Sequence, residues 1–286
     1  MVTPTLNLIG PGRLGRSLAR LWHDGGCVRV GAIAGRNPAH TRAARDFIGG
    51  GRPCSAASMS PAELWLIATP DDSIAEVATM LAASGLVRPG DCVFHCSGAL
   101  GSTALAPARA IGAVIASVHP LKSFVDPAAA IADFAGTFCA CEGDPAALQH
   151  LAPLFDTIGA RRFAVSAEHK LLYHAAAVLA CNHLVSLMEA ALRCMEGAGV
   201  ERGTAWAALQ PLVAGTLNNI DRVGTRAALT GPVARGDGQT IRSEIAATGA
   251  LDSDIGDAYR VLSLLALELA PEGNGLTRGD IGGPDR

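Results

Sequence analysis

The segment CVFHCSGALG, residues 92–101, places three side chains that can do chemistry, His95, Cys96 and Ser97, directly after a short apolar run. Taken alone, the segment suits a nucleophile beside a base, half of a metal site or the wall of a cofactor pocket. A serine hydrolase of the α/β type would need the turn Gly-x-Ser-x-Gly, which differs from the turn here. No further ligands stand at a spacing typical of a metal site, so we predict no bound metal.

A second apolar run ends in the same way, because SVHPLKSF, residues 117–124, carries a histidine and a lysine at its end. If both runs are strands of one parallel sheet, their carboxyl ends meet at the edge where ligands bind. The predicted contacts are His95, Ser97 and Gly98 for the cofactor and His119 and Lys122 for the substrate. His119 is also a catalytic candidate; the alternative is a turn that ends the strand before proline.

Lys170 and His174 stand four residues apart in EHKLLYHAAAVLACNHLVSL, so a helix would put both on one stripe. Such a pair could donate a proton during reduction of a carbonyl or imine, because partial burial lowers the pKa of a lysine toward neutrality. The alternatives are a lysine whose ammonium reaches solvent and a histidine that is hydrogen-bonded in the core. Farther along, Asn182 and Arg235 are predicted to bind the substrate, Arg235 by pairing with a carboxylate.

The elements that must position these residues follow from the alternation of short apolar runs with helical segments up to about residue 164. We predict strands at residues 6–9, 28–34, 64–68, 92–95, 113–118, 137–141 and 162–165. One long helix is expected over 167–197, followed by helices near 201–222, 238–249 and 252–270. The fold class is therefore α/β, with a parallel-sheet domain at 1–164 and an all-α domain at 165–286.

The first strand and helix are joined by Gly10-x-Gly12-x-x-Gly15 in LNLIGPGRLGRSLARLW. In the dinucleotide-binding Rossmann fold the first glycine permits a tight turn, the second lets the backbone approach a pyrophosphate, and the third allows close packing. The predicted cofactor contacts here are Gly10, Pro11, Gly12, Arg13, Leu14 and Gly15. The alternative is a glycine-rich turn that binds nothing; its place between a strand and a helix favours dinucleotide binding.

The end of the second strand, AIAGRNPAH, indicates which dinucleotide is bound. An NAD-binding chain would carry an acidic residue there, whereas this chain carries Arg36 and Asn37. Because a guanidinium pairs well with a 2′-phosphate, we predict NADP(H); the alternative is a solvated surface arginine. In ATPDDSI, Thr69 and Pro70 follow another strand and are predicted to contact the cofactor.

Composition bounds the partners and the location. The chain has 286 residues, a net charge of -3 and no run of Lys or Arg, so neither nucleic acid nor a membrane surface is expected as a partner. Its eight cysteines and its N-terminal sequence fit a reduced, cytoplasmic protein without a signal peptide. Because residues 171–192 include two histidines, an asparagine and a glutamate besides the apolar residues, we expect a buried helix rather than a membrane span. The expected ligand is a small molecule.

Six motifs in combination resemble a family of two-domain bacterial proteins with a Rossmann-like N-terminal domain and a C-terminal domain of unknown function (2520). The motifs are GPGRLG, ATPDDSI, HCSGALG, SVHPLKSF, KLLYHAAAVLACNHLV and LTGPVARGD, which cover most of residues 6–240. That family is similar to the larger group of 6-phosphogluconate and β-hydroxyacid dehydrogenases, pyrroline-5-carboxylate reductase, prephenate dehydrogenase and ketopantoate reductase. The resemblance implies a nicotinamide dinucleotide in the N-terminal domain, substrate between the domains, and a homodimer formed by the C-terminal helices.

In the β-hydroxyacid dehydrogenases the interdomain helix carries a catalytic lysine and, four residues later, an asparagine. Lys170 matches the first position, and His174 replaces the asparagine. We therefore predict an NADP(H)-dependent oxidoreductase that moves hydride between nicotinamide and a small, carboxylate-bearing keto, hydroxy or imino substrate, with ketopantoate reduction preferred. The alternative is a non-catalytic dinucleotide-binding sensor or partner protein, because a fold does not guarantee an activity.

Overall fold

The N-terminal part of the chain alternates strands with helices in the computed structural model, which describes residues 3–283. The strands are β1 (Thr5–Ile9), β2 (Arg29–Ala34), β3 (Arg52–Cys54), β4 (Leu64–Ile67), β5 (Cys92–His95), β6 (Val114–Pro120), β7 (Phe138–Gly143) and β8 (Arg161–Ala164). The helices are α1 (Arg13–Asp24), α2 (Pro38–Ile48), α3 (Asp71–Ala83), α4 (Ala106–Ala110), α5 (Pro127–Ala132), α6 (Pro145–Thr157) and α7 (Lys170–Ala180).

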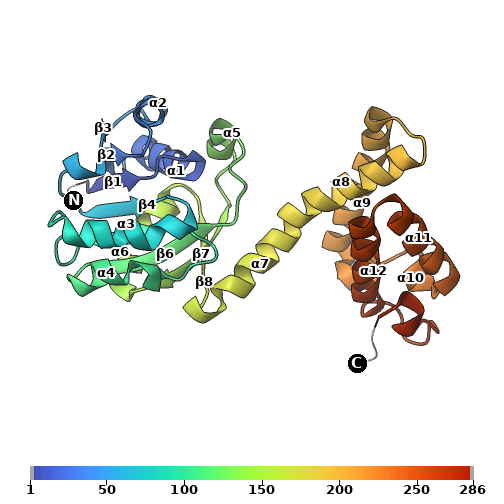
Figure 1. Ribbon diagram of the computed structural model, residues 1–286. Coiled ribbons are helices and arrows are strands. Elements are labelled where there is room, and N and C mark those ends of the chain that lie inside the picture. Colours follow the sequence, from blue (N-terminus) through green and yellow to red (C-terminus); the bar gives the residue numbers. More distant parts are fainter. Residues whose placement is uncertain (1–2, 284–286) are drawn as a thin grey trace. The chain divides into compact units, whose positions relative to one another are not determined.

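The strands form one sheet in the order β3-β2-β1-β4-β5-β6-β7-β8, drawn in Figure 1. Every neighbouring pair is parallel except β6 and β7, which are antiparallel. The predicted class, a mostly parallel sheet with helices, is confirmed. The direction of β7 was not foreseen, since an apolar run does not encode strand direction. The prediction also missed β3, which has three residues including Pro53 and lies at the sheet edge, where proline is tolerated.

Side chains along the strands alternate between two cores on opposite faces of the sheet. In β4, Leu64 and Leu66 pack into the core beneath α1 and α6, whereas Trp65 and Ile67 pack into the core beneath α3 and α4. This period of two is what a strand covered on both faces requires. Both faces are therefore filled by helices, which leaves the carboxyl edge of the sheet as the place for a ligand.

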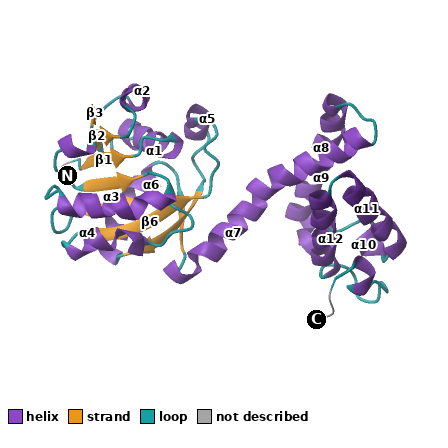
Figure 2. Cartoon of the chain, viewed as in Figure 1, coloured by secondary structure: helices purple, strands orange, loops and turns teal. Residues whose placement is uncertain are grey.

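From Cys181 onward the described chain is helical, and Figure 2 shows no strand there among the described residues. The helices are α8 (Asn182–Gly197), α9 (Arg202–Ala228), α10 (Pro232–Arg235), α11 (Gly238–Leu251) and α12 (Ser253–Leu267). The predicted all-α C-terminal region is confirmed. The chain divides into two compact units, of which the first ends at Ala180 and the second begins at Cys181. The predicted boundary after residue 164 lies at the end of β8, and the first compact unit continues from there through α7.

The long helix predicted over 167–197 is interrupted at Cys181, between α7 and α8. The expectation that it is buried is wrong within one copy of the chain, because Leu171, Leu172 and Leu179 are between 65% and 73% exposed. By length and composition alone, the segment Ala167–Gly197 is long and apolar enough to cross a membrane. The helix α7 is therefore apolar on a surface that the rest of the first unit does not cover.

Candidate functional site

The turn between β1 and α1 carries three glycines with different surroundings. Gly10 has a φ of 87°, and a Cβ there would lie 2.7 Å from the backbone of Ala68. At Gly15 a Cβ would lie 2.8 Å from the carbonyl oxygen of Gly10. At Gly12, by contrast, a Cβ would have no described atom within 4 Å. Packing therefore requires the first and third glycines, whereas the second leaves the backbone open to a ligand, as a pyrophosphate needs.

The start of α1 is a suitable place for an anion. Gly12 is the N-cap, and none of the described side chains bonds the first N–H groups or places a carboxylate in the first turn. The free amides and the positive end of the helix dipole then face the turn. Of the predicted neighbours, Arg13 is exposed and Leu14 packs against the core.

A cavity of about 800 Å³ opens beside this turn, at the carboxyl ends of β1, β2 and β4. Among the predicted cofactor contacts it is lined by Gly10, Pro11, Gly12, Arg36, Asn37, Thr69 and Pro70. Its volume is within the range typical of cofactor sites. The structure thus brings the glycine turn, the end of β2 and the end of β4 to one cavity, although nothing in the sequence relates the three directly.

The end of β2 presents a cation and no carboxylate to this cavity. Arg36 is exposed, and His40 from α2 lines the same wall. The side chain of Asn37 has another role: its oxygen accepts hydrogen bonds from the N–H groups of Ala39 and His40, at 2.8 and 3.3 Å, and so caps α2. Glu76 of α3 is the one carboxylate that lines the cavity in the described chain.

The hydroxyl of Thr69 is an orphaned polar group in the wall of this cavity. Its Oγ1 is buried and has no hydrogen-bond partner among the described residues. Such a group normally finds a partner, so it fits a site that a polar ligand completes. Together with the open backbone at Gly12 and the guanidinium of Arg36, it makes the cavity suited to a phosphate-bearing dinucleotide.

His95 holds the turn after β5 rather than facing a ligand. It is fully buried; its Nδ1 accepts the N–H of Ser97 at 3.1 Å, and its Nε2 donates to the carbonyl of Gly101 at 3.1 Å. Burial lowers the pKa of His95 to about 4, which keeps the ring neutral at pH 7, as this pattern of one acceptor and one donor requires. The predicted cofactor contact therefore has no ring nitrogen left for a ligand.

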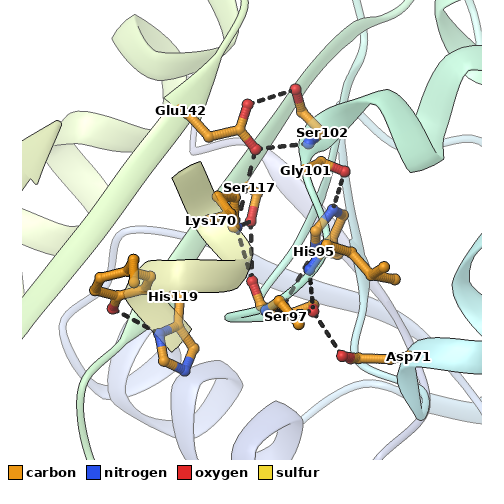
Figure 3. Close-up of polar contacts among 12 residues, drawn as sticks. Asp71, His95, Ser97, Gly101, Ser102, Ser117, His119, Glu142 and Lys170 are labelled. Atoms are coloured by element: carbon orange, nitrogen blue, oxygen red, sulfur yellow. Dashed lines mark hydrogen bonds and ion pairs between the residues drawn. The ribbon is translucent and has the colours of Figure 1, made fainter. Parts of the chain in front are cut away.

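Ser97 is also engaged within the protein, as Figure 3 shows. Its hydroxyl donates to Asp71 at 2.8 Å and accepts the N–H groups of Ala99 and Leu100 at 3.2 and 2.9 Å. These contacts tie the turn after β5 to the first residue of α3. Ser97 therefore sets the shape of the turn, and Gly98 follows it.

Lys170, the first residue of α7, is fully buried behind the same turn. Its Nζ donates to the carbonyl of Ser97 at 2.8 Å and to the Ser117 hydroxyl, and it lies 3.9 Å from Glu142 Oε1 (Figure 3). Burial lowers the pKa of Lys170, and the carboxylate of Glu142 opposes that shift. The predicted lowering of its pKa by burial is found, whereas the alternative of an ammonium that reaches solvent is not: the ammonium is enclosed by its partners.

Glu142 and Ser117 were missed by sequence reasoning. Glu142 is buried and accepts both the N–H and the hydroxyl of Ser102, at 2.6 and 2.8 Å. It stands directly opposite Ser117 in the antiparallel register of β6 and β7. The signals available in the sequence were a glutamate inside the apolar run TFCACEG and a serine two residues before His119.

His119 and His174 meet at Gly98. Their rings are edge to face with centroids 5.6 Å apart, and a Cβ on Gly98 would lie 2.9 Å from His119 Nε2 and closer still to His174 Nδ1. The Nδ1 of His174 is buried without a partner among the described residues. Tyr173, which the prediction passed over, places its hydroxyl 2.8 Å from His119 Nδ1. Burial, helped by His174, lowers the pKa of His119 to about 4.

The remaining predicted substrate contacts lie elsewhere. The ammonium of Lys122 is 2.8 Å from the carboxylate of Asp133, at the end of α5. Asn182 begins α8 and Arg235 ends α10, both exposed in the second unit. Their roles in substrate binding stay predictions.

No group of three or more His, Cys, Asp or Glu side chains in the described residues is arranged to hold a metal ion. The eight cysteines are free, and burial raises the pKa of the Cys96 thiol. Cys96 therefore packs as an uncharged side chain beside the turn.

Comparison with protein families gives two matches. A model described as a Rossmann-like domain matches residues 4–120, and one described as a domain of unknown function (DUF2520) matches residues 137–266. A comparison with curated proteins finds no match.

Solved structures share the fold across nearly the whole chain. A protein from Thermotoga maritima is 28% identical with a TM-score of 0.69, over 93% of this chain and 98% of that one. A "putative NADP oxidoreductase" from Bacteroides fragilis is 20% identical with a TM-score of 0.76, over the same shares. A reductive aminase from Aspergillus terreus, in complex with NADPH and ethyl-5-oxohexanoate, is 16% identical with a TM-score of 0.67, over 96% of each chain.

The architecture is thus shared, at low identity, with reductases that use nicotinamide dinucleotides. Together with the glycine turn and the helical C-terminal region, the matches show that the chain combines a Rossmann-like N-terminal domain with a C-terminal domain of the DUF2520 family.

Proposed function

We propose that the protein is an NADP(H)-dependent oxidoreductase acting on a small keto or imino substrate that carries a carboxylate. The observation that carries the proposal is the cavity of about 800 Å³ at the sheet edge, where the open backbone of Gly12, the orphaned Thr69 hydroxyl and the Arg36 guanidinium converge. When bound, the dinucleotide supplies a hydride at its nicotinamide ring. Binding and orientation are the tasks of the protein.

Each part of the cavity has a distinct task in this proposal. The backbone from Gly10 to Gly12 and the start of α1 would hold the pyrophosphate. Arg36, with His40 beside it, would hold the 2′-phosphate, because a guanidinium pairs with phosphate through charge-assisted hydrogen bonds. Thr69 would bond a polar group of the dinucleotide. The turn held by His95 and Ser97 would close the site beyond β4.

The dissociation constants of NADPH and NADH test the cofactor assignment. Arg36→Ala should weaken NADPH binding by about 10- to 100-fold, since a hydrogen bond to a charged group contributes about 1.5–3 kcal/mol, and should change NADH binding little. Arg45→Ala, on the same helix as His40 but outside the cavity lining, is the matched control. Equal NADPH-to-NADH selectivity in wild type and Arg36→Ala would refute the assignment.

One observation favours the alternative, a dinucleotide-binding sensor without catalysis: the expected catalytic lysine, Lys170, is enclosed by its partners. Consumption of NADPH across 2-keto acids, ketopantoate and cyclic imino acids separates the two functions. An enzyme will oxidise NADPH with at least one of them. A protein that binds NADPH and oxidises it with none is a sensor.

We also propose that the protein is a homodimer whose contact includes the exposed leucines of α7, Leu171, Leu172 and Leu179. Three such side chains on one helix would be costly to leave in water. A lipid environment suits the segment less well, because His174 and Glu189 fall within the same stretch. Analytical ultracentrifugation without detergent should give the mass of two chains, and Leu172→Glu should give one; a wild-type monomer contradicts the proposal.

A further inference from the structure

The direction of the hydrogen bond between Tyr173 and His119 depends on the tautomer of His119. Burial raises the pKa of Tyr173 to about 12, so at neutral pH the side chain is a phenol with one proton to donate. Nδ1 of His119, at 2.8 Å, is the one acceptor that the phenol has among the described residues. The tautomer in which Tyr173 donates puts the proton of His119 on Nε2.

The Nε2 edge of His119 lies beside Gly98. No described group hydrogen-bonds Nε2, and the nearest atoms to a Cβ built on Gly98 are those of the His119 and His174 ring edges. The missing side chain thus lets both imidazoles lie closer to the turn after β5 than any side chain at residue 98 would allow. The unpaired Nδ1 of His174 lies beside the same glycine.

Tyr173 is held in place from its other side. The Tyr173 ring packs edge to face against Phe163 of β8, with centroids 6.0 Å apart, and against His119, at 5.7 Å. These two ring contacts restrict the rotamers of Tyr173, which keeps its hydroxyl aimed at Nδ1. Figure 3 shows His119 apart from the cluster that surrounds Lys170.

Resting on the proposed function, we propose that His119, with Tyr173 behind it, gives a proton to the carbonyl oxygen of a keto substrate, and that Lys170 is a positioning residue. A donor N–H stabilises negative charge that develops on oxygen, which is what ketone reduction requires. A protonated imine would call for a carboxylate instead, and none is hydrogen-bonded to His119 or His174 among the described residues.

The proton transfer balances with NADPH as the reductant. As hydride adds to the carbonyl carbon, the C=O π electrons move to oxygen, which takes the proton from His119 as the Nε2–H bond breaks. Nδ1 takes the phenolic proton of Tyr173, so the imidazole stays neutral throughout. Nε2 then recovers a proton from water and the Nδ1 proton returns to the phenolate, which restores the starting tautomer. A relay of this kind suits His119 because burial lowers its pKa to about 4, which disfavours an imidazolium.

The tautomer of His119 can be read without any substrate. In the full-length protein labelled with ¹⁵N-histidine, NMR should show His119 protonated on Nε2, with a neutral ring down to about pH 4. The groups whose charge acts on it in this range are His174, Lys170 and Asp71. Tyr173→Phe should remove the bond to Nδ1 and shift its ¹⁵N resonance. A ring protonated on Nδ1 would overturn the proposal.

Turnover tests the same proposal with NADPH and the keto acids pyruvate, 2-oxoglutarate and ketopantoate. His119→Gln should lower kcat by about 100-fold or more, the usual contribution of a general acid, and Tyr173→Phe should also lower kcat, while the Kd of NADPH stays unchanged. The other of the two tyrosines in the chain supplies the matched control: Tyr259→Phe, in the second unit, should keep wild-type kcat.

Different outcomes refute the proposed reductase function and the proton relay through His119. A wild-type protein that oxidises NADPH with no keto or imino acid refutes the proposed function and this inference with it. A wild-type enzyme whose kcat is unchanged by Tyr173→Phe or His119→Gln refutes the relay alone. A wild type that reduces only the cyclic imino acid pyrroline-2-carboxylate likewise overturns the assignment to a keto group and leaves the reductase standing.

Discussion

Replacing Lys170 by methionine removes a buried positive charge and keeps most of the side-chain volume. At 3.9 Å from Glu142, the ammonium attracts the carboxylate by about 4 kcal/mol at an effective dielectric constant of about 20. The substitution also takes the donor from the Ser97 carbonyl and the Ser117 hydroxyl. Breaking one side of a buried pair costs about 3–5 kcal/mol, so the free energy of unfolding should fall by that amount.

The pairing has a specific signature in a double-mutant cycle. Glu142→Gln alone should also lower the free energy of unfolding, because it leaves the Lys170 ammonium buried without its counter-charge. The double variant should lose less free energy of unfolding than the two single variants lose together, with a coupling free energy of up to about 3 kcal/mol. Since Lys170 does not line the dinucleotide cavity, NADPH binding by folded Lys170→Met should be retained.

Urea unfolding followed by tryptophan fluorescence measures these changes in the first unit, where Trp22 and Trp65 are fully buried. The chain has two lysines, and the other supplies the control: Lys122 pairs with Asp133, whose side chain is 71% exposed, so Lys122→Met should cost less than about 1 kcal/mol. If Lys170→Met is as stable as Lys122→Met, the reasoning that makes Lys170 a brace of the β5 turn is refuted.

Two further predictions concern the same turn. Between pH 6.5 and 4, His95 and His119 should each lower stability by about 3 kcal/mol, because the pKa of each ring is lowered to about 4 in the folded protein and the unfolded ring binds its proton first. His95→Gln should remove about half of this fall in urea titrations, and an unchanged slope would contradict the reasoning. Gly98→Ala should lower kcat by about 10-fold or more, since its Cβ would lie 2.9 Å from His119 Nε2 and must displace the ring. Gly215→Ala, with open space around it in α9, should leave kcat unchanged; equal kcat in both variants would show that the ring position does not matter.

Most of the scaffold could be predicted because its signals are local. The glycine turn, the strand that precedes it and the helix that follows it lie within one short stretch, and the structure places all three where the spacing predicts. Arg36 could be assigned to the end of β2 for the same reason. The direction of β7 could not be predicted, because it depends on the path of the chain after α5. The periodicity of the sequence contains no information on that path.

The orientation of side chains at the turn after β5 lies beyond sequence reasoning. The segment CVFHCSGALG predicts that polar side chains follow the end of a strand. It does not predict which of these side chains face the protein interior. His95 ends β5 and is fully buried, with both nitrogens used to shape the turn, whereas His119, in the next strand, keeps one nitrogen free of described partners. Two histidines with similar sequence surroundings thus have opposite roles. The difference comes from their hydrogen bonds: His95 bonds Gly101, six positions away, and His119 bonds Tyr173, 54 positions away.

Lys170 shows why residue type and helix position are insufficient to identify a proton donor. A lysine at the start of this helix can approach a substrate only if its ammonium is not already satisfied, and in the structure a carboxylate from β7 and two oxygens from the sheet edge satisfy it. Charges removed from water must be matched by partners, and a matched ammonium is costly to withdraw. His119 differs because its partner Tyr173 is uncharged at neutral pH: the phenol orients the imidazole without holding its reactive proton, which stays on the nitrogen that faces Gly98.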